Sequence, residues 1–401
     1  MKIIAGLGVI SPDRLCREAE LNLSGAKDAR LELKIPDSIA YLPMINAHDH
    51  LVGNWVPKAG DNRPYPNSHI WVEDMKDSFS FHERNKFWLN DGSFVLSAPP
   101  ALTVARLGAY KNLFSGCGIV QDHGPLQDDS YYDAMPINVI RKYRQCHSLT
   151  MGNWWGGESP AKEMQLSGKM MPFIVHLGEG TDEVTAKEFA RLKAEGLLQE
   201  NTLMIHGIAF TPDEIKDIAA AGASVCWCPT SNFYLIGKTF DIASAMKHKA
   251  NVVIGTDSTM SGAVNLIGEF ARIRKHNPEL PLKELYRMVT VNAVKALYLP
   301  QRYGELSLDD TQNLLLLDRR FEDPFENLVN MDMTDVKLLL VDGIPRYGDV
   351  EYLEYFADDS IIYTLFSAAG KEKFVIGDPL EISKEIDQAL GYHKDFPFLP
   401  F

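Results

Sequence analysis

The sequence predicts an α/β protein built on a (β/α)8 barrel of the TIM type, with a small β-rich domain formed from both chain ends. Between residues 41 and 304, short apolar runs alternate with helical patterns. Strand-like segments flank this region on both sides, and polar residues stand directly at the ends of several apolar runs. Alternating strands and helices are typical of a parallel sheet. Strand-rich chain ends are typical of one small sheet, because termini tend to lie close together.

The apolar runs are expected to be buried parallel strands. They are near-continuously apolar, as strands covered on both faces should be. They comprise residues 41–46, 117–122, 145–151, 171–176, 201–206, 223–228 and 251–257. These are seven strands, and a closed barrel needs eight. The missing strand is expected between residues 151 and 171, so either a strand is hidden there or the barrel is distorted.

Helical segments between and after these runs carry recognisable signals. Residues 211–222 begin with Thr-Pro-Asp-Glu, a capping pattern, and end on a glycine. Residues 263–276 have an apolar face at helical spacing, and residues 380–390 form a further helix. The expected division is a small β-rich domain from residues 1–41 and 305–350, a barrel over 42–304, and a C-terminal extension over 351–401.

Composition excludes several classes of partner. The net charge of −14 repels phosphate backbones and anionic membrane surfaces, so neither nucleic acid nor membrane is an expected partner. No apolar run approaches the ~20 residues of a membrane span. Five cysteines without a C-x-x-C pair indicate a reduced, cytoplasmic protein. The initial KIIAGLGVI is expected to be a strand rather than a short signal peptide, because no small-residue cleavage site follows it.

Polar residues at the strand ends form the candidate site. His48 and His50 stand in NAHDHL after the first run, and side chains at i and i+2 of a strand share a face. His176, His206 and Asp257 each end a later run. The carboxyl ends of barrel strands form the catalytic face, so these side chains should meet there. Imidazoles with one carboxylate suit zinc, iron or manganese.

Glu179 follows His176 by three residues, in HLGE. This spacing would place its carboxyl group above the metal, where it could transfer protons. The alternative is a solvated carboxylate on a loop.

Several motifs together carry a family resemblance. The order His-x-His, His-x-x-Glu, His and Thr-Asp-Ser resembles the amidohydrolase superfamily, and in particular its branch of cytosine and guanine deaminases and triazine chlorohydrolases. The segments SGCGIVQD (115–122), CPTSN (228–232), GTDS (255–258) and TVNAVKAL (290–297) are similar to segments of that branch. The resemblance covers roughly residues 40–350 and does not specify a substrate.

The resemblance implies that His48, His50, His176 and Asp257 hold one divalent metal. Zinc is the expected ion, with iron or manganese as alternatives. Such an ion lowers the pKa of a water molecule to about 7 and so supplies hydroxide at neutral pH. Asp257 could take the proton of that water, and His206 could stabilise charge on the tetrahedral centre. Glu179 could protonate a ring nitrogen and then the leaving group.

Other residues are weaker candidates for substrate contacts. Trp154 and Trp155 could stack on a flat ring or could simply pack. His123 could line the pocket or be a structural histidine, and Asn232 belongs to the CPTSN segment. Binuclear relatives use a carboxylated lysine at the end of strand four, for which Lys162 is the formal candidate. His-x-x-Glu and CPTSN favour a single metal.

The predicted function is a metal-dependent hydrolase of C–N bonds other than peptide bonds. The leading hypothesis is a hydrolytic deaminase of a small aminated N-heterocycle of the purine, pyrimidine, pterin or triazine type. The same site could instead open a cyclic amide, as ring hydrolases of the imidazolonepropionase type do. A third hypothesis is a catalytically inactive barrel used for binding. A homo-oligomer is compatible with the sequence.

Overall fold

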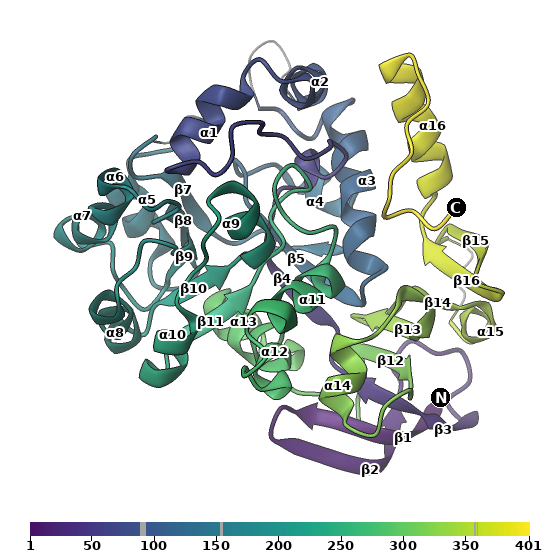
Figure 1. Ribbon diagram of the computed structural model, residues 1–401. Helices are drawn as coiled ribbons and strands as arrows, with labels where there is room; N and C mark the ends of the chain where they lie inside the picture. Colours follow the sequence, from purple (N-terminus) through teal and green to yellow (C-terminus); the bar gives the residue numbers. More distant parts are fainter. Residues whose placement is uncertain (89–93, 153–154, 357, 359) are drawn as a thin grey trace.

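The computed structural model describes residues 1–401 except 89–93, 153–154, 357 and 359, and it has mixed α/β content (Figure 1). Its strands form three sheets, of eight, five and three strands. Two of the sheets are parallel and lie in the region predicted as a barrel. The largest sheet combines both ends of the chain.

The two parallel sheets contain eight strands in chain order. They are β4 (Met44–Asp49), β5 (Cys117–Asp122) and β6 (Asn138–Val139) in one sheet, and β7 (Arg144–Ser148), β8 (Phe173–Leu177), β9 (Thr202–His206), β10 (Ser224–Trp227) and β11 (Asn251–Ile254) in the other. All seven predicted strands are therefore confirmed. The backbone N–H groups of Thr256 and Asp257 both donate to the carbonyl of His48, at 3.0 and 3.1 Å, which joins the end of β11 to β4. The described ladders contain no pairing of β6 with β7, so they do not establish a closed barrel.

The position expected for the missing strand was wrong. The described part of residues 151–171 forms helix α5 (Pro160–Ser167) and contains no strand. Ser159 caps α5 by accepting a hydrogen bond from the Lys162 N–H, and Gly168 ends the helix in the left-handed conformation. The additional parallel strand is β6, whose two residues are too few to leave an apolar pattern in the sequence.

Helices surround the parallel sheets. Those from the first part of the chain are α1 (Ser68–Met75), α2 (Phe79–Trp88), α3 (Ala101–Leu113), α4 (Asp129–Asp133), α6 (Glu183–Ala186) and α7 (Glu188–Ala194), with the 3-10 turn η1 (Leu51–Gly53). Those that follow are α8 (Pro212–Ala221), α9 (Pro229–Leu235), α10 (Ile242–His248), α11 (Leu266–His276), α12 (Leu282–Met288) and α13 (Val291–Ala296).

The helices predicted from end signals are confirmed. Thr211 and Glu214 form the capping box of α8, and Gly222 ends it in the left-handed conformation. Helix α11 begins three residues later than its apolar pattern, because the side chain of Asn265 accepts a hydrogen bond from the Gly268 N–H and so fixes the first turn. The C-terminal helix is α16 (Pro379–Leu390).

The eight-stranded sheet draws on three segments of the chain. Its order is β15-β16-β14-β13-β12-β3-β1-β2. The strands are β1 (Lys2–Ser11), β2 (Arg14–Asn22), β3 (Glu32–Tyr41), β12 (Leu314–Asp318), β13 (Val336–Val341), β14 (Ile344–Asp349), β15 (Tyr363–Ala368) and β16 (Lys371–Ile376). The turns η2 (Gln301–Tyr303) and η3 (Met333–Asp335) and the helices α14 (Pro324–Val329) and α15 (Val350–Leu353) accompany them. The N-terminal strand is confirmed as β1. The sheet also includes β15 and β16, beyond residue 350, and the division into three parts stays a prediction.

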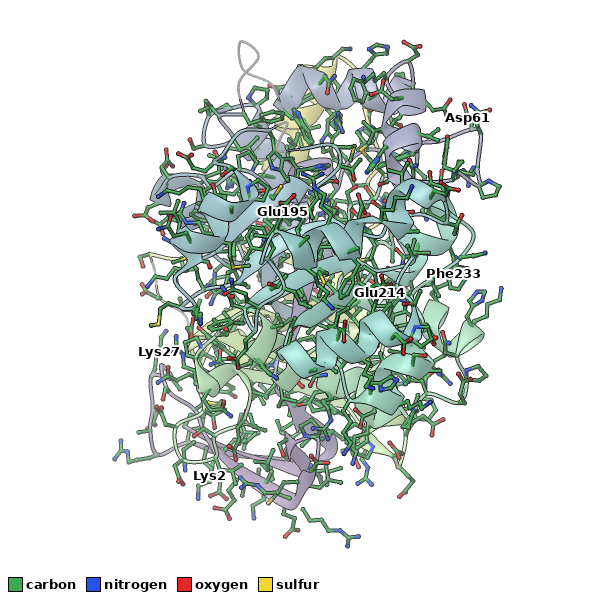
Figure 2. The ribbon with its side chains drawn as sticks, turned by 90° about the vertical axis from the view of Figure 1, so that its left-hand side faces the viewer. Lys2, Lys27, Asp61, Glu195, Glu214 and Phe233 are labelled. Atoms are coloured by element: carbon green, nitrogen blue, oxygen red, sulfur yellow. The ribbon has the colours of Figure 1, made fainter. Side chains whose placement is uncertain are left out.

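The two ends of the molecule differ in structure. Strands β1 to β3 lie at one end, and α1 and α2 lie on the other side of the parallel strands (Figure 1). In the side view, Lys2, in β1 of the eight-stranded sheet, lies at one end, and Asp61, in the segment before α1, lies at the opposite end (Figure 2). Within the described residues, no helix is both long and apolar enough to cross a membrane.

Candidate metal centre

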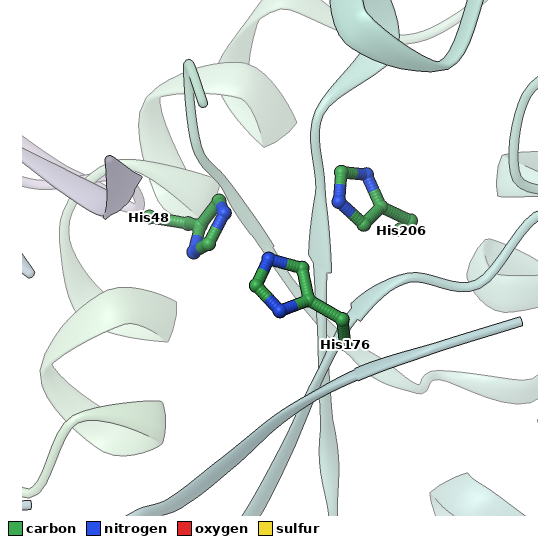
Figure 3. Close-up of side chains that lie close together, drawn as sticks. All are labelled: His48, His176 and His206. Carbon is green, nitrogen blue, oxygen red and sulfur yellow. The ribbon is translucent and has the colours of Figure 1, made fainter. Parts of the chain in front are cut away.

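The polar residues predicted from the strand ends lie together in the structure. His48 lies in β4, His176 in β8 and His206 at the end of β9. His50 directly follows β4, and Asp257 follows β11 by three residues. The rings of His48, His176 and His206 come from different strands and meet in one space (Figure 3). The parallel arrangement of the strands produces this meeting, because their carboxyl ends lie at the same edge.

His48 is at the centre of the cluster. Its ring centroid lies 4.8 Å from that of His50 and 5.0 Å from that of His176. The Nε2 atoms of His48 and His50 lie 3.9 and 3.6 Å from Oδ1 of Asp257. Potential ligand atoms within 4.8 Å of one another form two groups: His48, His176 and His206, and His48, His50 and Asp257. The geometry therefore adds His206 to the four predicted ligands as a fifth candidate.

The histidines are oriented as metal ligands would be. Both ring nitrogens of His48 are buried and have no hydrogen-bond partner among the described residues, an arrangement that needs an explanation in a native protein. Nδ1 of His176 lies 2.8 Å from the carbonyl oxygen of His147. A carbonyl oxygen only accepts hydrogen bonds, so His176 carries its proton on Nδ1. Its Nε2 is then unprotonated, and the lone pair of this atom can bind a metal. These residues fit a divalent metal ion.

The protonation states favour metal binding. Burial, followed by the neighbouring imidazoles, lowers the pKa of His48 and of His176 well below the usual range, so both rings are neutral at pH 7. Burial alone would raise the pKa of Asp257. His50 and His206, together with hydrogen bonds from the Ser231 hydroxyl and the Ser258 N–H, outweigh burial and lower it. His48 and His176 thus offer neutral imidazoles, and Asp257 offers a carboxylate.

The backbone at the cluster is strained. His206 and Asp257 have φ angles of 77° and 58°, in the left-handed region that residues other than glycine rarely adopt. Gly255 allows the close approach of the segment after β11, because a Cβ there would lie 2.6 Å from Cβ of His48. Strain of this kind concentrates at functional sites, where the surrounding structure maintains it.

Glu179 lies beside the cluster, as its spacing from His176 predicted. Its Oε1 is 3.4 Å from Nε2 of His206, and its side chain is buried. Burial raises the pKa of Glu179 to about 7. Nδ1 of His206 lies 2.8 Å from the amide oxygen of Asn232, which places the His206 proton on Nδ1 and leaves Nε2 facing Glu179. A carboxyl group with this pKa can both donate and accept a proton at neutral pH.

A buried polar network below the cluster was not predicted. The ammonium group of Lys111, on α3, lies 3.0 Å from Oδ1 of Asp49, and both side chains are fully buried. Lys111 also donates to the Asp257 carbonyl at 3.1 Å and to the Thr256 hydroxyl at 3.3 Å. Asp49 stands between His48 and His50 in the sequence. The network therefore ties the His-x-His segment to the segment that carries Asp257. A single helical lysine gives no sequence signal for this role.

The cluster opens into a cavity of about 540 Å³. Its wall combines residues of the cluster with aromatic and sulfur-containing side chains from α1, α2 and the loops. The lining includes His50, Ser68, Trp71, Met75, Phe81, Arg84, Trp88, Phe94, His147, Met151, Trp155, His176, Glu179, His206, Asp257 and Met260. A largely apolar cavity with a few convergent polar groups is the usual form of a small-molecule site.

The predicted substrate contacts have different positions. Trp155 lines the cavity, and its indole N–H donates to Gln145 at 2.9 Å. Trp154 lies outside the described residues. The ring of His123 stacks on that of His176 at 4.6 Å and lines a small adjoining cavity. Asn232 is fully buried behind His206 and is not among the cavity residues, so its position supports orientation of His206 rather than contact with substrate.

Two further residues depart from the sequence analysis. Lys162 is exposed on α5 and donates to Gln165, so it cannot serve as a buried carboxylated ligand. His147 received no predicted role, yet its ring lines the cavity and packs against Trp155 at 4.5 Å. Its place within the fourth parallel strand, near the carboxyl end, was a signal of the same kind as that of His176.

Comparisons with known proteins agree with this geometry. Residues 162–346, just under half of the chain, match the model of the amidohydrolase family. The chain is 30% identical over 138 residues to a 5-methylthioadenosine/S-adenosylhomocysteine deaminase of Pyrococcus abyssi, covering 31% of this chain and 32% of that protein. It is 25% identical over 199 residues to the guanine deaminase of Rattus norvegicus, covering 45% and 44%. The aligned chain therefore spans about a third to under a half of these relatives.

A solved structure shows the same fold over more of the chain. The atrazine chlorohydrolase of Arthrobacter aurescens, crystallised with zinc, superposes with a TM-score of 0.65 at 17% sequence identity. The match covers 86% of this chain and 94% of that protein. The match of residues 162–346 to the amidohydrolase family model confirms the resemblance inferred from the motifs.

Proposed function

We propose that the chain is a hydrolytic deaminase of an aminated N-heterocycle, working on a distorted (β/α)8 barrel that β4 to β11 form. The observation that carries the proposal is the meeting of the histidine–aspartate cluster with the carboxyl group of Glu179 in one cavity. In the reaction, water adds to the ring carbon that bears the amino group, the C–N bond breaks, and ammonia leaves. The ring keeps the oxygen as a carbonyl.

The proposed metal ligands are His48, His50, His176 and Asp257, and the proposed ion is one zinc per chain. When bound, a divalent ion lowers the pKa of water to about 7 and supplies the nucleophile at neutral pH. Asp257 accepts hydrogen bonds from Ser231 and Ser261 on Oδ2, at 2.7 and 2.8 Å. Its Oδ1 is the oxygen that faces the imidazoles, and this atom can take the proton of the attacking water.

Glu179 is the proposed proton carrier toward the substrate. With a pKa of about 7 it can give a proton to a ring nitrogen and then to the departing amino group. His206 contributes at Nε2, which lies 3.4 Å from Glu179. A proton on this atom would let His206 donate a hydrogen bond to developing negative charge.

Deamination is favoured over the alternatives by the named relatives. The two curated relatives described above are deaminases. The cyclic amide alternative gains no support from them. A binding protein without activity would have no need of the proton carrier beside the cluster.

The test is ammonia release by metal-replete protein over a panel of purines, pyrimidines, pterins and triazines. We expect stoichiometric ammonia from at least one class and close to one transition metal per chain by elemental analysis. Cyclic imidazolones form a parallel set. Ring opening without ammonia would identify the alternative reaction, and two metal equivalents would contradict the mononuclear assignment.

A further inference from the structure

A buried cation in the cavity wall has no carboxylate partner among the residues that the structure describes. Arg84 lies on α2, on the side of the parallel strands opposite β1 to β3 (Figure 1). Its side chain belongs to the cavity wall, although the residue is only 7% exposed. Burying a charge is costly unless another group compensates it, so the partners of this guanidinium group indicate its role.

The contacts of Arg84 leave its charge largely uncompensated. Its guanidinium group lies 4.0 Å from the ring centre of Trp88 and 4.4 Å from that of Phe81. Nε and Nη2 both donate to one acceptor, the side-chain oxygen of Asn85, at 3.3 and 3.2 Å. Within the described residues Arg84 forms no ion pair. Burial lowers its pKa to about 10, still far above neutral, so the group remains charged. A guanidinium group has five N–H donors, and three of them are not used in these contacts.

The carboxylates nearest in sequence have other partners. Glu83 pairs with Lys394 at 2.6 Å. Glu73, on the rim of the cavity, pairs with Lys76 at 2.6 Å. Neither is bonded to Arg84, and the other carboxylates of the cavity wall, Glu179 and Asp257, lie at the metal cluster.

The cavity has room for more than a heterocycle. Its volume of about 540 Å³ falls in the range of pockets that hold drug-sized ligands. The cluster occupies one part of the wall, and Phe81 and Trp88, whose rings contact Arg84, supply an apolar surface in another part. A substrate with its amino group at the cluster could therefore extend an apolar substituent along this surface.

We propose that the substrate carries a carboxylate on such a substituent and that Arg84 binds it. The inference rests on the proposed function and specifies its substrate class. A carboxylate fits a single guanidinium group because two parallel N–H donors match its two oxygens. A phosphate dianion would need a second cation, and the lysine among the described lining residues, Lys76, is already paired with Glu73. In this arrangement the aromatic rings would contact the apolar substituent that joins the carboxylate to the heterocycle.

The experiment compares matched ligands by calorimetric binding to metal-replete Glu179→Gln protein, which is expected to bind substrate and convert it slowly. The probes are adenines with N9 alkyl chains of two to five methylenes, ending in a carboxylate, its primary amide or a phosphonate. We expect the best carboxylate to bind roughly 10–100-fold more tightly than its amide, as a charged hydrogen bond of about 1.5–3 kcal/mol implies. The additional substitution Arg84→Met should remove this preference, and Arg84→Lys should keep part of it.

Equal affinity for carboxylate and amide at every length would overturn the proposal. A preference that survives both Arg84→Met and Arg84→Gln, in variants with unchanged melting temperatures, would also overturn it. Tighter binding of the phosphonate than of the carboxylate would also overturn the proposal, because the preferred substituent would then be a dianion. Binding is measured without turnover, so the two proposals can fail separately. If the Glu179→Gln protein prefers the carboxylate but the wild-type protein releases no ammonia, only the deaminase proposal is contradicted.

Discussion

Lys111 and Arg84 are both buried cations near the same cavity, yet their surroundings are opposite. Lys111, below the metal cluster, has Asp49 at 3.0 Å and two further oxygen acceptors. Arg84, in the aromatic part of the wall, has two aromatic faces and one amide oxygen, with no carboxylate partner in the part of the chain that the structure describes. We call the metal cluster and the network around Lys111 below it the floor of the cavity. The charge of Lys111 is compensated within this floor, whereas that of Arg84 has no such compensation among the described residues.

This difference assigns catalysis to the floor of the cavity and substrate preference to its aromatic part. A satisfied buried network fixes side chains in one arrangement, as catalysis requires of a metal cluster. An uncompensated cation among aromatic rings is suited to a group supplied by the substrate. Substitutions in the floor should therefore change kcat, metal content and stability. Substitutions in the aromatic part should change KM and preference among substrates.

The largest expected effect tests the floor. Glu179→Gln keeps the size of the side chain but cannot exchange a proton, and such groups contribute about 10²–10⁴-fold to rate. We expect kcat to fall by that factor while the protein keeps its metal. His176→Ala, three residues away, should lose both metal and activity. Metal analysis beside steady-state kinetics distinguishes the two variants. A wild-type rate in Glu179→Gln would require another proton carrier, and loss of its metal would make Glu179 a ligand.

The second prediction tests whether Lys111 compensates Asp49. Lys111→Met leaves a buried carboxylate without its cation, which should lower the free energy of unfolding by about 3–5 kcal/mol. Lys111→Met combined with Asp49→Asn removes both charges and should recover part of the loss. Urea denaturation of the metal-free proteins measures these changes, and chelator competition measures metal affinity. An unfolding free energy within 1 kcal/mol of wild type in the single variant would show that the pair contributes little.

The strand-end residues could be predicted because the pattern that makes a buried strand also fixes where it ends. Each apolar run stops at its polar residue, and parallel strands bring those stops to one edge. His176 and His206 follow from this rule, and so would His147. Lys111 does not, because a lysine on α3 becomes part of the site only through packing between segments far apart in the sequence.

The fold was less predictable where patterns were short or exposed. Strand β6 has two residues, which no periodicity can reveal. Residues 159–168 lie where a strand was expected, although Ser-Pro at the start and Gly168 at the end are helix signals. Strands β15 and β16 were missed because β15 has mixed exposure at the edge of the sheet. Arg84 stands in a segment rich in charged and aromatic residues, where nothing in the sequence distinguishes a buried arginine from an exposed one.

The third prediction concerns the pH dependence of the free energy of unfolding. Glu269, on α11, is fully buried, and its carboxyl group accepts hydrogen bonds from the N–H and hydroxyl of Thr230, at 3.1 and 2.8 Å. Burial raises its pKa to about 8 from the ordinary 4.5. The folded state therefore favours the protonated acid. Its contribution to stability is fully present below pH 4.5 and is lost as the pH rises toward 8.

Glu269→Gln should remove this pH dependence. Between pH 5 and pH 8, wild type should lose about 3 kcal/mol more unfolding free energy than Glu269→Gln does. Urea denaturation of both proteins at the two pH values measures the difference, and all other titrating groups cancel in the comparison. Parallel pH profiles for the two proteins would mean that Glu269 titrates normally.

The smallest expected effect returns to the cavity wall and concerns Trp155. Its indole ring lines the cavity and packs edge-to-face with His147 at 4.5 Å, while its N–H donates to Gln145 at 2.9 Å. If the ring also stacks on the substrate, Trp155→Ala should raise KM about 10-fold, the lower end of the ~1–3 kcal/mol of base–aromatic stacking. The value of kcat should change less, because the metal cluster remains.

Trp155→Phe keeps an aromatic face but loses the hydrogen bond to Gln145, so its KM should be close to that of wild type if stacking is the cause. A KM that stays high in Trp155→Phe would assign the effect to the Gln145 contact, and unchanged kinetics in Trp155→Ala would reduce the residue to packing. Steady-state kinetics of metal-replete, folded variants on the substrate found in the ammonia screen distinguishes the three outcomes.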